Sequence, residues 1–127
     1  MSNLITPENG NLYFEKGRAL YIKKQYTAAN DWFKKALFVF QTLRDQDNFV
    51  DTLRIMANAL DKMGKREESD NLSNIASHYA KMTRDVFEQE CDSIVFTPYT
   101  ERPTFFNTKQ SQLLSHLLND LKSLSQT

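Results

Sequence analysis

The sequence predicts an all-α protein built from helical hairpins, and three observations support this fold class. Small and bulky residues alternate at helical spacing over residues 13–37, with Gly17, Ala29 and Ala36 among the small ones. Such alternation lets two antiparallel helices approach closely at the small positions and interlock at the large ones. Apolar residues keep a helical period in most of the remaining chain. Only three glycines and three prolines interrupt the 127 residues, a length that suits one domain.

The first helix is expected to begin at Thr6-Pro7-Glu8 and to end at about Lys24. A hydroxyl cap, a proline where no amide partner is needed and an acid in the first turn are together typical of a helix start. A tight turn near Gln25-Tyr26 leads to a second helix from about Thr27 to Leu43. The residues expected to face inward on these two helices are Leu12, Tyr13, Lys16, Gly17, Leu20, Tyr21, Ala29, Trp32, Phe33, Ala36, Leu37 and Phe40.

A polar connector from Arg44 to Asn48 precedes a third helix, which is expected from about Phe49 to Met63. Gly64 ends this helix, as a left-handed residue does just after a helix terminus. A fourth helix begins near Arg66, and its apolar stripe continues to Cys91 without a phase break, a glycine or a proline. The stripe predicts one long helix of about 25 residues, spanning roughly 37 Å, whose far end projects beyond the hairpins.

The C-terminal part of the chain has a different composition. Residues 93–107 contain aromatic residues and prolines without a helical period, which indicates an extended connector. Residues 108–125 form an amphipathic helix with leucines on one face, among them Leu113, Leu117, Leu121 and Leu124. Because such a face is unstable in water, the helix either caps the open end of the hairpins or pairs with a second chain. The aromatic segment 96–106 either packs beneath this helix or occupies the chain's own groove as a self-inhibiting peptide.

A shift of 40 residues superposes the second hairpin on the first: Tyr13 falls on Leu53, Gly17 on Ala57 and Lys24 on Gly64. The first hairpin reads Tyr13-x-x-Lys16-Gly17-x-x-Leu20 and then Ala29-x-x-x-Phe33-x-x-Ala36. This pattern resembles the tetratricopeptide-repeat (TPR) family, whose unit is a helix–turn–helix of about 34 residues. The second copy, with Leu53-x-x-Met56-Ala57-x-x-Leu60, is degenerate because Ser69 and Ser73 replace larger or apolar residues.

The resemblance covers roughly residues 10–80. With the chain length, it predicts one helical-repeat domain over residues 1–127, with repeat 1 at about 8–44 and repeat 2 at about 48–92. It also implies a right-handed stack whose concave face, built from the first helix of each pair, holds a segment of a partner protein. The residues carried over to that face as partner-binding candidates are Phe14, Arg18, Tyr21, Arg54, Asn58 and Lys62, with Asn11, Ile22, Asp51 and Asp61 beside them. Arg54 and Asn58 lie one turn apart, so a forked guanidinium and an amide together suit a backbone or a carboxylate.

Composition argues against several other classes of function. The net charge is zero, whereas nucleic-acid and anionic-membrane binding favour a basic excess. No apolar run approaches the roughly 18 residues of a membrane span, and the single cysteine, Cys91, suits a reducing compartment, so a cytoplasmic location is expected. His78 and His116 have no metal-type partner near them in sequence, and no phosphate-binding loop or nucleophile motif is present. We therefore expect no catalysis, no cofactor and no metal.

The sequence thus favours a non-catalytic adaptor or chaperone-like module that binds a protein or peptide segment. Two alternatives remain open. In the first, the chain is a structural subunit that homo-oligomerises, or joins a larger complex, through its leucine-rich C-terminal helix. In the second, it is a dedicated inhibitor of an enzyme, with one very tight partner.

Overall fold

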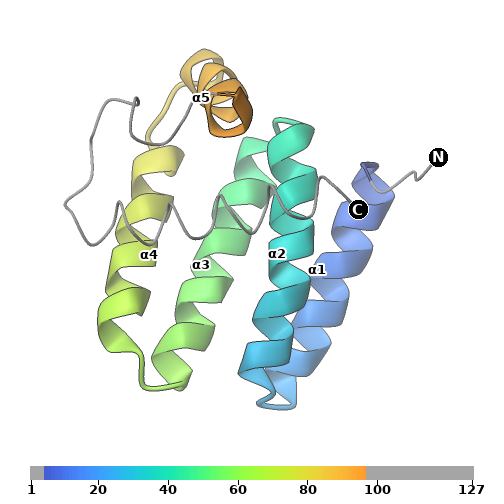
Figure 1. Cartoon of the computed structure of the whole chain (residues 1–127), viewed down its shortest axis with the longest axis vertical. Helices are drawn as coiled ribbons and strands as arrows, with labels where there is room; N and C mark the ends of the chain where they lie inside the picture. The colour runs from blue at the N-terminus through green and yellow to red at the C-terminus, as the bar shows by residue number, and fades with distance from the viewer. Residues whose placement is uncertain (1–4, 97–127) are drawn as a thin grey trace.

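The structure is a computed structural model that describes residues 5–96, with side chains through residue 91 (Figure 1). This part of the chain contains five α-helices and no β-strand, which confirms the all-α class. The helices are α1 (Pro7–Ile22), α2 (Tyr26–Thr42), α3 (Gln46–Lys62), α4 (Arg66–Ala80) and α5 (Arg84–Phe96). Helices α1 to α4 run alternately up and down in a row, and α5 lies across the end where α4 stops (Figure 1).

Two predictions for the C-terminal part of the chain fall largely outside the described residues. Residues 93–96, the start of the predicted extended connector, are helical and belong to α5. The rest of that connector and the helix predicted over 108–125, with its leucine stripe, are not described. Whether that helix caps the hairpins or pairs with a second chain therefore stays a prediction.

Side-chain caps set the beginnings of α1 and α3. The Thr6 hydroxyl accepts a hydrogen bond from the backbone N–H of Asn9 at 3.1 Å, with Pro7 as the first helical residue, which confirms the predicted start of α1. Asp45 caps α3 in the same way, accepting from the backbone N–H of Asn48 at 3.2 Å and from its side-chain amide at 2.7 Å. The connector predicted up to Asn48 is therefore shorter, because the carboxylate of Asp45 satisfies the first free amides of a helix that begins at Gln46.

The three turns between the first four helices share one geometry. Lys24, Arg44 and Gly64 each follow a helix with a positive φ, of 64°, 57° and 80°. At each turn two backbone N–H groups return to carbonyls of the preceding helix, as from Lys24 to Tyr21 and from Gln25 to Leu20, which is the Schellman arrangement. The left-handed role predicted for Gly64 is confirmed. Lys24, which the 40-residue shift pairs with Gly64, has the same conformation, although a side chain disfavours it.

The contact between α1 and α2 depends on two glycines. A Cβ atom on Gly17 would lie 2.6 Å from the ring of Phe33, and one on Gly10 would lie 2.7 Å from the ring of Phe40. The two glycines are two helical turns apart, as are the two phenylalanines, so each ring fills one glycine position in an antiparallel register. Both rings are almost fully buried. The backbone of α1 therefore approaches the two phenylalanine rings so closely that only glycine, which has no Cβ atom, fits at these two positions.

This register corrects the inward face predicted for α1. Leu12, expected inside, is 49% exposed, and Lys16 is exposed as well. Gly10, which the prediction left out, is buried. The bulky apolar residues of α1 predict one inward face, whereas Gly10 and Gly17 lie at the centre of the actual contact with α2.

The contact between α3 and α4 uses a small residue and a hydroxyl in place of a glycine and a ring. The Ser69 hydroxyl donates a hydrogen bond to the carbonyl oxygen of Ala57 at 2.7 Å, and both residues are buried. Ser69 departs from the apolar pattern of the first hairpin, but its polar group is satisfied, so burying it carries no large penalty. The remaining core of these helices is apolar: Val50, Leu53, Met56, Leu72, Ile75 and Ala76 are buried as predicted, and Leu60 is half-buried.

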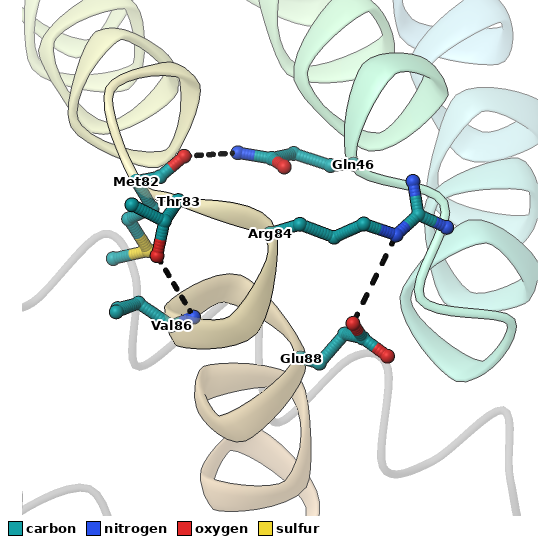
Figure 2. Close-up of polar contacts among 6 residues, drawn as sticks. All are labelled: Gln46, Met82, Thr83, Arg84, Val86 and Glu88. Atoms are coloured by element: carbon teal, nitrogen blue, oxygen red, sulfur yellow. Dashed lines mark hydrogen bonds and ion pairs between the residues drawn. The ribbon is translucent and has the colours of Figure 1, made fainter.

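The single long helix predicted from Arg66 to Cys91 is wrong, because the chain breaks between α4 and α5. The amide nitrogen of Gln46 donates to the carbonyl oxygens of Tyr79 and Met82, each at 2.9 Å. Figure 2 shows the contact with Met82. The Thr83 hydroxyl accepts from the backbone N–H of Val86 at 3.3 Å and so begins α5 (Figure 2). Helix α5 consequently folds back over the hairpins and does not project beyond them.

Phe87 anchors α5 in an aromatic cluster. Its ring is fully buried and meets Phe49 at 5.4 Å and Tyr79 at 6.2 Å between centroids, both edge-on. Phe49 and Tyr79 also meet edge-on, at 5.4 Å. Edge-on pairs at these separations stabilise beyond the area that they bury. The cluster joins the start of α3, the end of α4 and the first turns of α5.

We expect Gly17→Ala to destabilise the protein by about 1–3 kcal/mol, the usual cost of overpacking. The added methyl group would press on the Phe33 ring and would lie 3.0 Å from the carbonyl oxygen of Ala29, which cannot move independently of α2. This clash outweighs the roughly 1 kcal/mol by which alanine favours a helix over glycine. Urea unfolding measures the change. In a Phe33→Leu background the same substitution should cost less; an equal cost in both backgrounds would contradict the steric explanation.

Candidate protein-binding surface

Exposed polar residues of α3 gather on a single face, which we call the α3 face. Helix α3 packs along α2 on one side and along α4 on the other, so only one strip of it reaches solvent. Its residues are Asp47, Asp51, Arg54, Asn58, Asp61 and Lys62, all exposed. All three α3 residues predicted to bind a partner, Arg54, Asn58 and Lys62, therefore lie together on this face.

Arg54 and Asn58 have uncommitted polar groups. Within the described part of the chain, neither side chain forms a hydrogen bond or an ion pair, and the same holds for Lys62. Asp61, by contrast, lies 3.9 Å from the guanidinium of Arg66, a contact between exposed groups that contributes little to stability. A guanidinium and an amide one turn apart thus present donors and an acceptor to whatever approaches α3.

An open depression adjoins Arg54, between the first half of α3 and the end of α4; we call it the α3–α4 depression. Its volume is about 350 Å³, and its lining residues are Gln46, Asp47, Val50, Asp51, Arg54 and Ala80. The lining combines two carboxylates, one guanidinium and the edge of the nearly buried Val50. It therefore offers acceptors and donors side by side, over a small apolar floor.

Sequence reasoning missed part of this depression. The sequence predicts Gln46 and Asp47 in a connector and Ala80 inside one long helix. The capping potential of Asp45 is the signal that would have moved Gln46 and Asp47 onto the helix. No sequence signal brings Ala80 beside them, because that proximity comes from the antiparallel packing of α4 on α3.

The α1 residues that the sequence predicts to bind a partner lie in a different environment from those of α3. The ring of Phe14 packs on Phe33 at 5.4 Å, and that of Tyr21 packs edge-on against Tyr26 at 5.4 Å, so both are half-buried in the first hairpin. Arg18 is exposed and lies 3.5 Å from Glu15 of the same helix. Among the described residues, extensive contacts join α1 to α2 and α2 to α3, and none of that extent joins α1 to α3. The structure thus groups the α3 candidates but not the α1 candidates with them.

A second cluster lies on the first hairpin, around Trp32. The ammonium groups of Lys16 and Lys35 lie 4.7 Å and 4.3 Å from the centroid of the Trp32 ring, and Tyr13 packs against the same ring at 6.0 Å. Cation–π attraction accounts for this arrangement. Lys16 was expected to face inward; it instead covers the edge of the α1–α2 contact. These groups satisfy one another, so we assign them a structural role.

The described residues offer little for metal or membrane chemistry. No group of three or more His, Cys, Asp and Glu side chains in residues 5–91 is arranged to hold a metal ion. None of the helices from α1 to α5 combines the length and the apolar character needed to cross a membrane. Cys91 is buried on the inner side of α5, where the side-chain amide of Gln41 donates to its backbone carbonyl at 3.1 Å.

His78 lies near the end of α4, half-buried. Burial lowers its pKa below the ordinary value of 6.5, and the positive charge of Lys81 lowers it further. Both causes disfavour the protonated ring. His78 is therefore mainly neutral near pH 7 and is sensitive to acidification.

Comparison with known proteins assigns no family to this chain. It matches no protein-family model, no curated protein and no solved structure. The resemblance to TPR repeats therefore remains a prediction from the residues themselves. Function has to be argued from the α3 face and its surroundings.

We expect acidification to destabilise the protein in part through His78. Because its native pKa is lower than its unfolded pKa, the unfolded chain binds the proton more readily, and stability falls as the pH drops through 6.5 towards the native pKa. Replacing the residue, as in His78→Gln, removes this contribution. Urea midpoints at pH 8 and pH 5 should therefore differ less for the variant than for the wild type, and an unchanged difference would count against a depressed pKa.

Proposed function

We propose that this chain is a non-catalytic protein–protein interaction module, an adaptor or chaperone-like protein with TPR-like repeats that holds a segment of a partner along the α3 face. One observation carries the proposal. Arg54 and Asn58 are exposed one turn apart, beside the α3–α4 depression, and no described residue engages their polar groups. Side chains that serve only solubility need no such depression next to them.

The chemistry of the surface suggests what the segment contributes. Arg54 offers a forked donor that suits a carboxylate, and Asn58 both donates to and accepts from a peptide backbone. Asp47 and Asp51 line the depression on the other side of Arg54 and accept hydrogen bonds from a basic or amide group. Lys62 extends the face by one further turn beyond Asn58. A segment that carries an acidic group and a donor in succession fits this order of charges.

The repeat geometry supports the TPR-like part of the proposal. Lys24 and Gly64, 40 residues apart, end the first helix of each hairpin in the same left-handed conformation. Gly17 and Ala57, also 40 residues apart, lie where the two helices of each hairpin approach most closely. Under this proposal α1 and α3 are equivalent helices, and Arg18 is the exposed candidate on α1. Phe14 and Tyr21 then shape the first hairpin more than they touch the segment.

The decisive variant is Arg54→Glu combined with Asn58→Ala. Both residues are exposed and unbonded within the described chain, so the fold should be unaffected, while the donors of the α3 face are lost and one charge is reversed. A matched control is Lys23→Glu with Asn74→Ala, which likewise reverses one positive charge and removes one side-chain amide, at exposed positions that belong neither to the α3 face nor to the α3–α4 depression. Circular dichroism and urea unfolding establish that both variants are folded.

Affinity capture from the native lysate, followed by binding measurements with the purified candidate, tests the proposal. We expect a protein that the wild type and the control retain and that the α3-face variant binds about tenfold or more weakly, as expected for lost hydrogen bonds to charged groups. Equal binding by all three would place the contact elsewhere and reject the proposal. Capture of copies of this chain alone would favour the oligomeric alternative based on Leu113, Leu117, Leu121 and Leu124. One very tight enzyme partner would favour the inhibitor.

A further inference from the structure

Two arrangements of residues 66–91 satisfy the same apolar pattern. The stripe that contains Tyr79, Phe87 and Cys91 keeps its helical phase across the α4–α5 junction, and no glycine or proline interrupts it. A continuous helix is thus compatible with the local sequence, yet the described chain is broken there. The break must therefore be stabilised by groups from other parts of the protein.

Several of these groups lie among the described residues. Gln46 holds the junction through the carbonyl oxygen of Tyr79 and that of Met82, the second of which Figure 2 shows. Gln41 holds α5 further along through the carbonyl oxygen of Cys91. Phe87 supplies the main apolar anchor. Among the described residues, α5 has no contact with another helix as extensive as those that join α1 to α2, α2 to α3 and α3 to α4.

The local contacts in the first turn of α5 contribute little to holding the helix in its position. The hydrogen bond to the Thr83 hydroxyl is 3.3 Å long and exposed, and the ion pair between Arg84 and Glu88 is 3.8 Å long between exposed groups (Figure 2). An exposed ion pair contributes little to stability, and the long cap hydrogen bond acts only within the first turn of α5. The position of α5 thus depends on side chains of α2 and α3, namely Gln41, Gln46 and Phe49.

We propose that α5 is a reversible latch with two states: docked, as in this structure, and released, in which α4 continues into α5 as one helix. Release frees the amide of Gln46 and opens the space that Phe87 fills against Phe49. It also brings Cys91, buried in the docked state, into contact with solvent.

The latch adjoins the surface described above but does not depend on the function proposed for it. Gln46 both holds the junction and lines the α3–α4 depression, and Ala80 lines the depression from the last turn of α4. The lining residues of the depression come from α3 and α4, and Gln46 is the one that also holds the junction. A ligand that binds the Gln46 side chain as it lies in the docked state therefore favours that state, because release frees this side chain.

Cys91 reports on the latch, because it is the only cysteine in the chain and is 2% exposed when α5 is docked. Its alkylation by iodoacetamide proceeds from conformations that expose the thiol, and when closing is fast the rate follows their population. Opening of α5 alone exposes less surface than global unfolding. We therefore expect the labelling rate to depend on urea more weakly than global unfolding does.

Loss of either glutamine contact should shift the latch towards release. Gln46→Ala removes two hydrogen bonds from the junction and should raise the labelling rate of Cys91 about tenfold. Gln41→Ala should act in the same direction through α5 itself. Gln25→Ala is the matched control, since it makes the same change in an exposed residue between α1 and α2. Hydrogen exchange of α2 and α3 separates release of α5 from general unfolding.

A proline at position 84 tests the released state directly. Arg84→Pro suits the first turn of α5, where the backbone N–H has no helical partner. In a continuous helix the same proline would remove a hydrogen bond and clash with the carbonyl of Ala80. Labelling of Cys91 should therefore be about tenfold or more slower in Arg84→Pro than in Arg84→Ala, which removes only the exposed ion pair.

Three results would overturn the latch. The first is labelling of the wild type with the full urea dependence of global unfolding, which would mean that α5 never opens on its own. The second is labelling of the two glutamine variants no faster than that of Gln25→Ala, once global stability is taken into account. The third is equal labelling rates for Arg84→Pro and Arg84→Ala, which would rule out the continuous helix as the released state.

Discussion

The close approach of α1 and α2 at Gly10 and Gly17 is the constraint on which the rest of the structure depends. Because the rings of Phe33 and Phe40 occupy the glycine positions, α1 has only one rotation about its axis that fits. That rotation turns Leu12 outward and leaves α2 buried on the side of α1. The opposite side of α2 is then available to α3, so each later helix is placed by the one before it.

The sequence predicts a helix end that a local signal marks better than it predicts the rotation of a helix about its axis. Thr6 and Gly64 are local signals, since a hydroxyl cap and a left-handed glycine act within a few residues of the chain. Lys24 and Arg44 have the conformation of Gly64 without its chemical advantage, so their turns follow from the packing of the helices on either side. The rotation of α1 escaped prediction because a glycine in a helix is ordinarily a weak point, not the centre of a contact.

The same distinction between local signals and tertiary packing applies to the residues of the candidate surface. Arg54 and Asn58 lie on the face opposite the apolar period of α3, and the sequence alone places them in solvent. Phe14 and Tyr21 were assigned to a concave face from family geometry, yet in the structure their rings contact aromatic neighbours across the first hairpin. The depression beside Arg54 includes Ala80, and only tertiary packing brings a residue from the end of α4 to the start of α3.

The break between α4 and α5 shows why periodicity alone cannot determine where a helix ends. An apolar stripe records which side chains are buried, and Tyr79 and Phe87 are buried in the broken arrangement as they would be on one face of a single helix. What distinguishes the two arrangements is a polar contact, from the amide of Gln46 to backbone carbonyls that a continuous helix would bond internally. Because Gln46 also lines the depression, the end of α4 and the shape of the candidate surface are determined by the same side chain.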